Sequence, residues 1–326
     1  AVSFQDPPWQ ILITLIRCGL LGAYEVGLQF DAASPVGGNF SLMSWLRFNY
    51  YTKNQIISYP EGKIRLKNSI GDHGELILEG NCLFDFFKKN YLAEVNDANG
   101  NGNIPRGERI YTGASYDEYE GLIAYNHKII NDKNSTISGL DLKPLAGYTM
   151  RRYNSTFSNR DQDITKLGLG LNLGFMSRAD LEITGTYEWV VSPGDDELIL
   201  FDETIAVADV NGDGEIKRNA PVVTAIDRSC TRYTLGVNPS FRISKKARIF
   251  AGYERRITSY DSSNRLDIDH YDQQACRQKI SSGIKYAFSK AWSAQVAYTR
   301  TDDDADMEDE DYTENSYLVK VKYNFM

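Results

Sequence analysis

The sequence contains no long apolar run. Hydrophobic residues make up 42% of its 326 residues. No stretch approaches the about 18–20 consecutive apolar residues that a membrane-spanning helix needs. This excludes a membrane protein built from spanning helices and leaves open one built from strands. The start, residues 1–6, also lacks the basic residues of a signal peptide, so we expect a mature chain.

Positive charge is also scarce. The chain has 36 Lys and Arg against 44 Asp and Glu, and its formal net charge is -8. Because phosphate binding needs a basic surface, nucleic acid is not expected as a partner.

The four cysteines, Cys18, Cys82, Cys230 and Cys276, form no C-x-x-C pair and no metal-ligand spacing. An even number in an exported protein is compatible with disulfides, and four cysteines allow three pairings. Cys230 and Cys276 both lie near expected outer strand ends, which favours that pair, although their strands are not adjacent in the predicted order. Reduced cysteines are the alternative.

Strict alternation of apolar and polar residues is the clearest pattern present. It is strongest in a hairpin over residues 164–191, where small or polar residues separate the members of each apolar row. The two rows are Leu167, Leu169, Leu171, Leu173 and Phe175, then Leu181, Ile183, Gly185, Tyr187, Trp189 and Val191. Side chains of a strand point to opposite faces with period two, so this hairpin has one apolar and one polar face.

The alternation recurs to the end of the chain, and the connections between strands are alternately short and long. The expected short ones are residues 33–39, 70–73, 131–135, 176–180, 243–246 and 289–290, and the long ones are 51–58, 90–109, 153–163, 192–221, 259–271 and 301–314. This pattern predicts an all-β, antiparallel, up-and-down transmembrane β-barrel as a single domain over residues 1–326. Counting a first strand at residues 9–17 gives about 14 strands, with 12 as the second choice. A soluble β-sandwich is the alternative.

The closing segment, Tyr317–Met326, resembles the C-terminal assembly signal of Gram-negative outer-membrane β-barrels, porins in particular. The aromatic residue usual at the end of that signal is here the penultimate Phe325. The resemblance covers nearly the whole chain and implies a bacterial outer membrane, with outer-membrane lipid and lipopolysaccharide around the barrel. It also implies small polar solutes as ligands, and either a homo-oligomer or a surface protein as partner.

The expected inner face has more basic than acidic residues. The basic set is Lys63, Arg65, Lys67, Lys143, Arg151, Lys166, Arg232, Arg248, Arg256, Lys279, Lys285, Lys320 and Lys322; the acidic set is Glu25, Asp31, Asp85, Asp141, Glu182, Glu188 and Glu254. If the lumen is open, this lining favours anions. Alternatively, opposite charges pair and fill a narrow barrel.

Two long loops resemble the calcium loops of EF-hand and dockerin proteins. Calcium prefers six to eight oxygen ligands, which alternate positions of a tight loop supply around a glycine. In the first loop the expected ligands are Asp97, Asn99, Asn101, Asn103 and Glu108, and in the second Asp209, Asn211, Asp213 and Glu215. The second has Ala220 at the twelfth position, so Asp202 or Glu203 would close it. The alternative is a loop rich in Asn, Asp and Gly whose residues favour turns and bind no calcium.

We do not expect an enzyme. The chain has only three histidines, and it lacks the His-x-Ser-Asn-Gly stretch of outer-membrane phospholipases. Asp267, Asp269 and His270 lie in one expected outer loop, but not at the spacing of outer-membrane proteases. The function expected is passive passage of small polar or ionic solutes through a porin-like channel. The alternatives are a closed structural or interaction barrel with partner-binding loops and, third, a hydrolase at the barrel rim.

Overall fold

The computed structural model describes residues 10–18, 24–37, 39–51, 59–95, 109–132, 135–176, 178–192, 196–200, 222–263, 271–289, 292–305 and 312–324. Nearly all of the regular structure in these ranges is strand. The elements are β1 (Gln10–Cys18), β2 (Tyr24–Gly37), β3 (Phe40–Tyr51), β4 (Tyr59–Ile70), β5 (Gly74–Val95), β6 (Arg109–Asn131), β7 (Ile137–Tyr153), η3 (Ser155–Arg160), β8 (Gln162–Phe175), β9 (Ala179–Val191), β10 (Asp196–Leu200), β11 (Val222–Ile226), β12 (Cys230–Arg242), β13 (Ala247–Tyr260), β14 (Gln274–Ala287), β15 (Trp292–Ala305) and β16 (Tyr312–Asn324). Within the described residues, no helix is both long and apolar enough to span a membrane.

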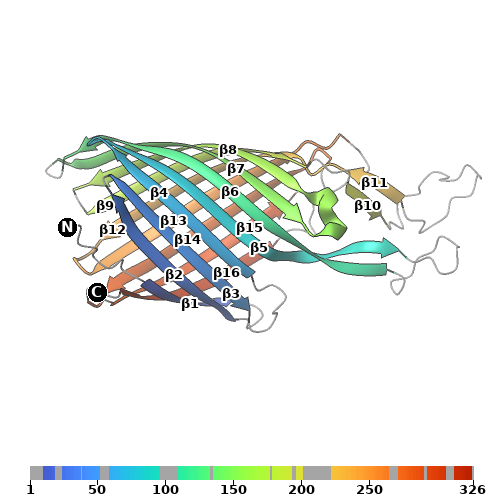
Figure 1. Cartoon of the computed structure of the whole chain (residues 1–326), viewed down its shortest axis with the longest axis horizontal. Helices are drawn as coiled ribbons and strands as arrows, with labels where there is room; N and C mark the ends of the chain where they lie inside the picture. The colour runs from blue at the N-terminus through green and yellow to red at the C-terminus, as the bar shows by residue number, and fades with distance from the viewer. Residues whose placement is uncertain are drawn as a thin grey trace, which may run out of the picture.

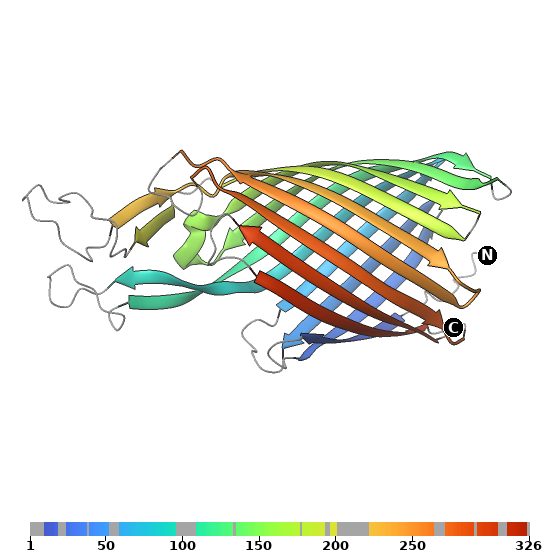
Figure 2. The ribbon, with the colours of Figure 1, turned by 180° about the vertical axis from the view of Figure 1, so that it is seen from behind.

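One sheet forms a closed barrel in the order β1-β16-β15-β14-β13-β12-β9-β8-β7-β6-β5-β4-β3-β2. β1 pairs with β16 on one side and with β2 on the other, and both pairings are antiparallel. All other neighbours follow one another along the barrel strands, so the topology is up-and-down (Figures 1 and 2). The fold class expected from the alternation is confirmed.

The two ends of the barrel differ in the length of their connections. Gln10 of β1 lies opposite Asn324 of β16, so the first strand begins where the last one ends. The short connections, such as the one from Ile70 to Gly74, lie at this short-turn end. The opposite, long-loop end carries the longer connections, including η3, and the hairpin β10–β11 (Figure 1). The predicted alternation of short and long connections is confirmed.

The outer face of the barrel is apolar and has aromatic side chains near both ends. Leu169 and Leu235 flank Gly185 on the outer wall, and both leucines are about half exposed. Towards the long-loop end, the Tyr187 ring lies 4.1 Å from that of Trp189 and 4.5 Å from that of Tyr233. At the short-turn end, Tyr286 and Phe288 are 5.0 Å apart. An apolar band between aromatic rows is what a barrel surrounded by lipid requires.

Three segments extend further as strand than the sequence pattern predicted. β5 reaches Val95 and pairs with Arg109 of β6, so this hairpin projects beyond the rim at the long-loop end (Figure 1). β10 lies inside the range expected to be a loop, residues 192–221, and pairs with β11, which directly follows that range, to form a separate two-stranded sheet. β15 continues to Ala305, so Asp302 and Asp303 lie in a strand rather than in the long connection expected over residues 301–314. Ladder hydrogen bonds to a neighbouring strand stabilise such segments although their apolar alternation is weak.

The expected Cys230–Cys276 disulfide is absent, and both cysteines are free thiols. Cys230 is buried and shares its face of β12 with Arg232, on the inner wall. Cys276 shares its face of β14 with Ile280, which is half exposed on the outer wall. Because the two thiols lie on opposite faces of the sheet, with β13 between their strands, they cannot reach bonding distance.

Gly283 of β14 permits close packing of the inner wall, and we expect substitution there to destabilise the barrel. A Cβ atom at Gly283 would overlap the Phe250 ring and the backbone carbonyl oxygen of Val296. Relieving this overlap requires a shift of the strand backbone, which costs free energy. Gly283→Ala should therefore lower the free energy of unfolding by about 1–3 kcal/mol. Urea unfolding in detergent micelles measures this. Gly185→Ala, where a Cβ meets nothing within 4 Å, is the matched control, and an equal loss in both variants would contradict the prediction.

Candidate functional site

The polar inner wall of the barrel is the candidate site. On β4, Ile64 is exposed on the outer face, so the flanking Lys63 and Arg65 point inward. On β6, Tyr119 and Ile123 face outward, so Glu118 and Glu120 point inward. The alternation that makes the outer face apolar therefore gathers charged side chains around the lumen.

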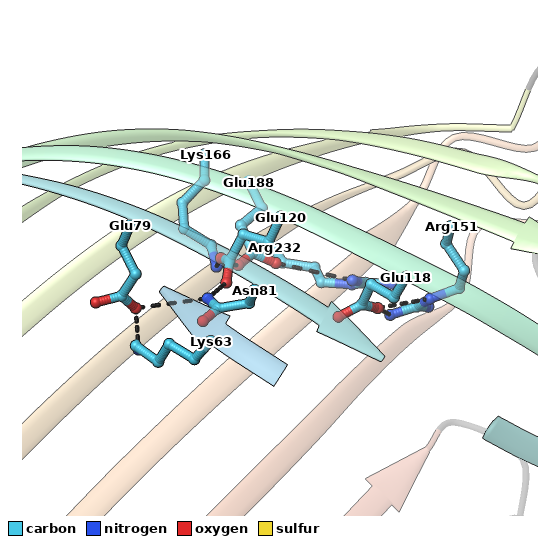
Figure 3. A network of polar contacts seen from close by, with 9 residues as sticks. All are labelled: Lys63, Glu79, Asn81, Glu118, Glu120, Arg151, Lys166, Glu188 and Arg232. Atoms are coloured by element: carbon cyan, nitrogen blue, oxygen red, sulfur yellow. Dashed lines mark hydrogen bonds and ion pairs between the residues drawn. The ribbon is translucent and has the colours of Figure 1, made fainter. Parts of the chain in front are cut away.

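A chain of polar contacts runs across the inner wall from β4 to β12 (Figure 3). Lys63 and Arg65 both bind the carboxylate of Glu79, the latter with an Nε to Oε2 distance of 2.6 Å. The Asn81 amide donates to Glu79 at 3.4 Å and to Glu120 at 2.5 Å. Asn81 therefore joins the β4–β5 contacts to the acidic residues of β6.

Lys166 of β8 connects the acidic residues on either side of it. Its ammonium lies 3.1 Å from Glu120 of β6 and 3.2 Å from Glu188 of β9, and Glu188 lies 3.7 Å from Arg232 of β12. Lys166 reaches Glu120 across β7, where its directly paired neighbour is Gly147. Because Gly147 has no side chain, nothing from β7 separates the two charged groups at this position.

Arg151 of β7 forms the densest set of contacts. Its Nε and Nη2 donate to Glu118 at 3.0 and 2.7 Å, and its Nη1 donates to Gln162 at 3.0 Å. The guanidinium carbon also lies 4.7 Å from the centroid of the Tyr116 ring. This arrangement uses the planar guanidinium fork as well as its charge, and lysine has no equivalent fork.

The sequence predicted an excess of basic side chains on the inner wall, but acidic partners balance most of these bases from β4 to β12. Further pairs on the same face are Lys67–Glu75 at 3.1 Å, Arg248–Asp180 at 3.2 Å and Arg277–Asp303 at 2.5 Å. Most inward bases from β4 to β12 thus have a carboxylate partner. The alternative stated above, in which opposite charges pair across the wall, describes this part of the lumen. Asp85, expected to point inward, is instead exposed at a β-bulge.

A cavity of the inner wall lies towards the short-turn end and measures about 700 Å³. Its polar lining includes Asp141, Asn172, Glu182 and Asn238, which are successive cross-strand neighbours on β7, β8, β9 and β12. Arg248 is the basic residue of this lining. The volume is sufficient for a hydrated ion or a small polar solute.

The predicted calcium ligands cannot be placed. All of them, from Asp97 to Glu108 and from Asp209 to Glu215, lie outside the described residues, as do Asp267, Asp269 and His270. In the part of the chain that the structure describes, no cluster of three or more His, Cys, Asp or Glu could hold a metal ion.

The predicted acidic set of the inner wall lacked six residues that form ion pairs there: Glu75, Glu79, Glu118, Glu120, Asp180 and Asp303. Asp180 and Asp303 fell in an expected turn and an expected loop. The signal for Glu118 and Glu120 was present, because Tyr119 and Ile123 mark the outer face and the even positions next to them must point inward. Extending that alternation along β6 would have found both.

No family model and no curated protein matches the sequence. Among solved structures, the chain is similar to the TodX monoaromatic hydrocarbon channel, in a deltaS2 mutant form, with a TM-score of 0.50 at 10% identity over 98% of this chain and 90% of that one. It is also similar to the outer membrane channel DcaP of Acinetobacter baumannii, with a TM-score of 0.49 at 10% identity over 98% and 96%. At this identity the likeness concerns the fold alone, and the fold is that of an outer-membrane β-barrel.

Proposed function

We propose that this protein is an outer-membrane channel for passive passage of small polar or ionic solutes. The observation that supports this best is the polar inner wall, which surrounds cavities of about 700 and 350 Å³ inside an apolar outer wall. A charged inner face serves passage of solutes through water, since a purely structural barrel could fill its interior with apolar side chains. Ion pairing along β4 to β12 implies weak charge selectivity rather than the anion preference expected from the sequence.

Single-channel recording in planar bilayers tests the proposal. Purified, folded protein should give steady open-channel currents in salt, and reversal potentials in a salt gradient should report a cation-to-anion permeability ratio near one. Folding is verified independently by the heat-dependent shift in electrophoretic mobility that closed barrels show. Folded protein without any conductance would overturn the channel.

A second candidate function is supported by the two projecting hairpins. β5–β6 and β10–β11 extend beyond the barrel at the long-loop end (Figure 2). Hairpins of this kind offer backbone and side chains to a surface partner, so a non-conducting interaction barrel is the alternative. Deleting residues 92–112 removes the tip of one hairpin without touching the barrel. Conductance should survive this deletion if the protein is a channel, and partner binding should be lost if it is an interaction barrel.

We also propose that calcium binds the two loops with the EF-hand-like spacing. The support is the sequence alone: alternate oxygen-bearing residues around a glycine, with Glu108 closing the first loop. Calcium should raise the melting temperature of the folded protein, and a chelator should reverse the shift. The double variant Asp209→Asn, Asp213→Asn should lower calcium affinity, measured by calorimetry, by about tenfold or more through loss of ligand charge. Asp195→Asn, in the same expected loop but outside the predicted ligand set, separates ligand loss from charge loss. Unaltered affinity in the double variant would refute this assignment.

A further inference from the structure

A second cavity of the inner wall lies towards the long-loop end, between β3, β4, β5 and β6, and measures about 350 Å³. Its apolar lining includes the aromatic residues Trp45, Tyr59 and Phe86. Its polar lining consists of Glu61, Asn81, Glu118 and Glu120. Tyr59 is the first residue of β4 after a long connection, so the cavity lies near the outer mouth.

A β-bulge creates this aromatic lining. The register of β5 shifts between Leu83 and Phe86, and Asp85 within the bulge has a φ of 49°. The Asp85 N–H donates to the Asp117 carboxylate at 2.8 Å, which holds the irregular turn of the backbone. Because the bulge adds a residue to one strand, Phe84 points outward while Phe86 points into the lumen opposite Tyr116. Simple alternation would place both rings on the lipid side.

The inward ring of Phe86 belongs to a row of four aromatic rings. Ring centroids are 4.8 Å apart for Tyr59 and Phe86, 5.2 Å for Phe86 and Tyr116, and 5.2 Å for Tyr116 and Tyr153. These residues come from four successive strands, β4 to β7. A row of aromatic rings on the inner wall of a channel makes few favourable contacts with water. A solute with an apolar face would gain favourable ring contacts as it passes over the row.

The charges beside the rings indicate which kind of solute fits. Arg151 neutralises the charge of Glu118, and Lys166 that of Glu120 (Figure 3). Each carboxylate can still accept further hydrogen bonds, because it has about four lone-pair sites. The ion pairing reduces the attraction of Glu118 and Glu120 for a cation, and Glu61 is the third carboxylate of the lining. A wholly apolar ligand would strip water from Asn81 and from the carboxylates without replacing its hydrogen bonds, which costs affinity. A ring with C–H groups on its faces and hydroxyls at its edge satisfies both parts of the lining.

We propose that this cavity binds a neutral polyhydroxylated ring of monosaccharide size as the solute enters the barrel. The volume of about 350 Å³ is at the small end of the range for ligand pockets. The ring faces would stack on Trp45, Tyr59 or Phe86. The hydroxyls would donate to Glu118, to Glu120 and to the amide oxygen of Asn81, whose NH2 group already donates to Glu79 and Glu120. This inference deepens the proposed channel function and rests on it for the route of the solute.

D-Glucose is the probe for the test, with tetramethylammonium and benzyl alcohol as the competing chemistries. Equilibrium binding to folded protein in detergent micelles is measured through tryptophan fluorescence, with Trp45→Phe identifying the reporting residue. D-Glucose should bind saturably and should reduce the open-channel current over the same concentration range. Saturable binding of tetramethylammonium or benzyl alcohol without binding of D-glucose would overturn the proposal.

Phe86→Ala and Phe84→Ala form a matched pair, because the two rings lie two residues apart on β5 and face opposite sides of the wall. Phe86→Ala should raise the half-saturating glucose concentration about tenfold, the factor that corresponds to about 1.4 kcal/mol for a lost ring contact. Phe84→Ala should leave it within about twofold. Equal effects of the two substitutions would overturn the site. If Phe86→Ala fails to fold, Tyr59→Ala tests the same cavity from β4 and keeps Trp45 as the fluorescent reporter.

The outcomes separate this inference from the channel proposal. Conductance without glucose binding contradicts the site and leaves the channel intact. Glucose binding that depends on Phe86, in folded protein without conductance, contradicts the channel and leaves a carbohydrate-binding barrel.

Discussion

Lys166→Met is expected to lower the free energy of unfolding by about 2–3 kcal/mol. Removing the ammonium leaves Glu120 and Glu188 on the inner wall without the cation that both contact. Losing one partner of a fully buried pair costs about 3–5 kcal/mol, and the lumen reduces this because it admits water. The exposed fractions of the Lys166 and Glu188 side chains are 23% and 10%, so the pair is neither fully buried nor fully exposed, and the expected cost lies below that of a fully buried pair. Urea unfolding followed by tryptophan fluorescence in micelles measures the loss.

Two controls make the Lys166 prediction specific. Lys143→Met removes another inward lysine, on the neighbouring β7, that forms no ion pair within the described residues, and it should cost under about 0.5 kcal/mol. Adding Glu120→Gln to Lys166→Met removes the orphaned charge and should restore more than half of the loss, because Glu188 keeps Arg232. The single variant should also shift the permeability ratio towards cations, since it leaves carboxylates in excess. A double variant no more stable than the single one would show that the ion pair is not the cause.

Arg151→Ala is expected to cost about 3 kcal/mol, because it removes the hydrogen bonds to Glu118 and Gln162 together with the contact to the Tyr116 ring. Gln162 is only 7% exposed, so its carbonyl oxygen would lose a partner that water does not readily replace. The informative variant is Arg151→Lys, which keeps the charge and loses the fork. We expect it to retain at most about half of the stabilisation.

Arg256→Lys is the matched control for Arg151. Arg256 lies on the inner wall of β13 and donates a single long hydrogen bond, 3.4 Å, to the Thr234 hydroxyl. Because no bidentate contact is lost there, the substitution should change stability by less than about 0.5 kcal/mol. If Arg151→Lys proved as mild as Arg256→Lys, then charge alone would account for the role of Arg151. Both variants are compared by the same urea titration.

Much of the fold was predictable because lipid and water impose alternation on every strand. The rows ending at Phe175 and beginning at Leu181 defined β8 and β9 to within a few residues. The alternation of short and long connections then distinguished the two ends of the barrel. β10 and β11 were missed because five-residue strands within a long loop produce too little alternation to be recognised.

The candidate site was less predictable, because it depends on which strands become neighbours. The sequence identified Lys166 and Glu188 as inward residues, but their link to Glu120 requires β6, β7 and β8 to lie side by side with Gly147 between them. Pairing across 46 positions of the chain leaves no local pattern.

What the sequence by itself determined is therefore the strand pattern, the two faces and the two ends, since each follows from side chains within one or two strands. The tertiary structure alone decided the register. It paired the charges, placed Cys230 and Cys276 on opposite faces, and turned Phe86 into the lumen through a single bulge. The physical reason is that a strand has period two, so an inserted residue reverses every side chain beyond it, and only pairing with the neighbouring strand fixes where that insertion occurs.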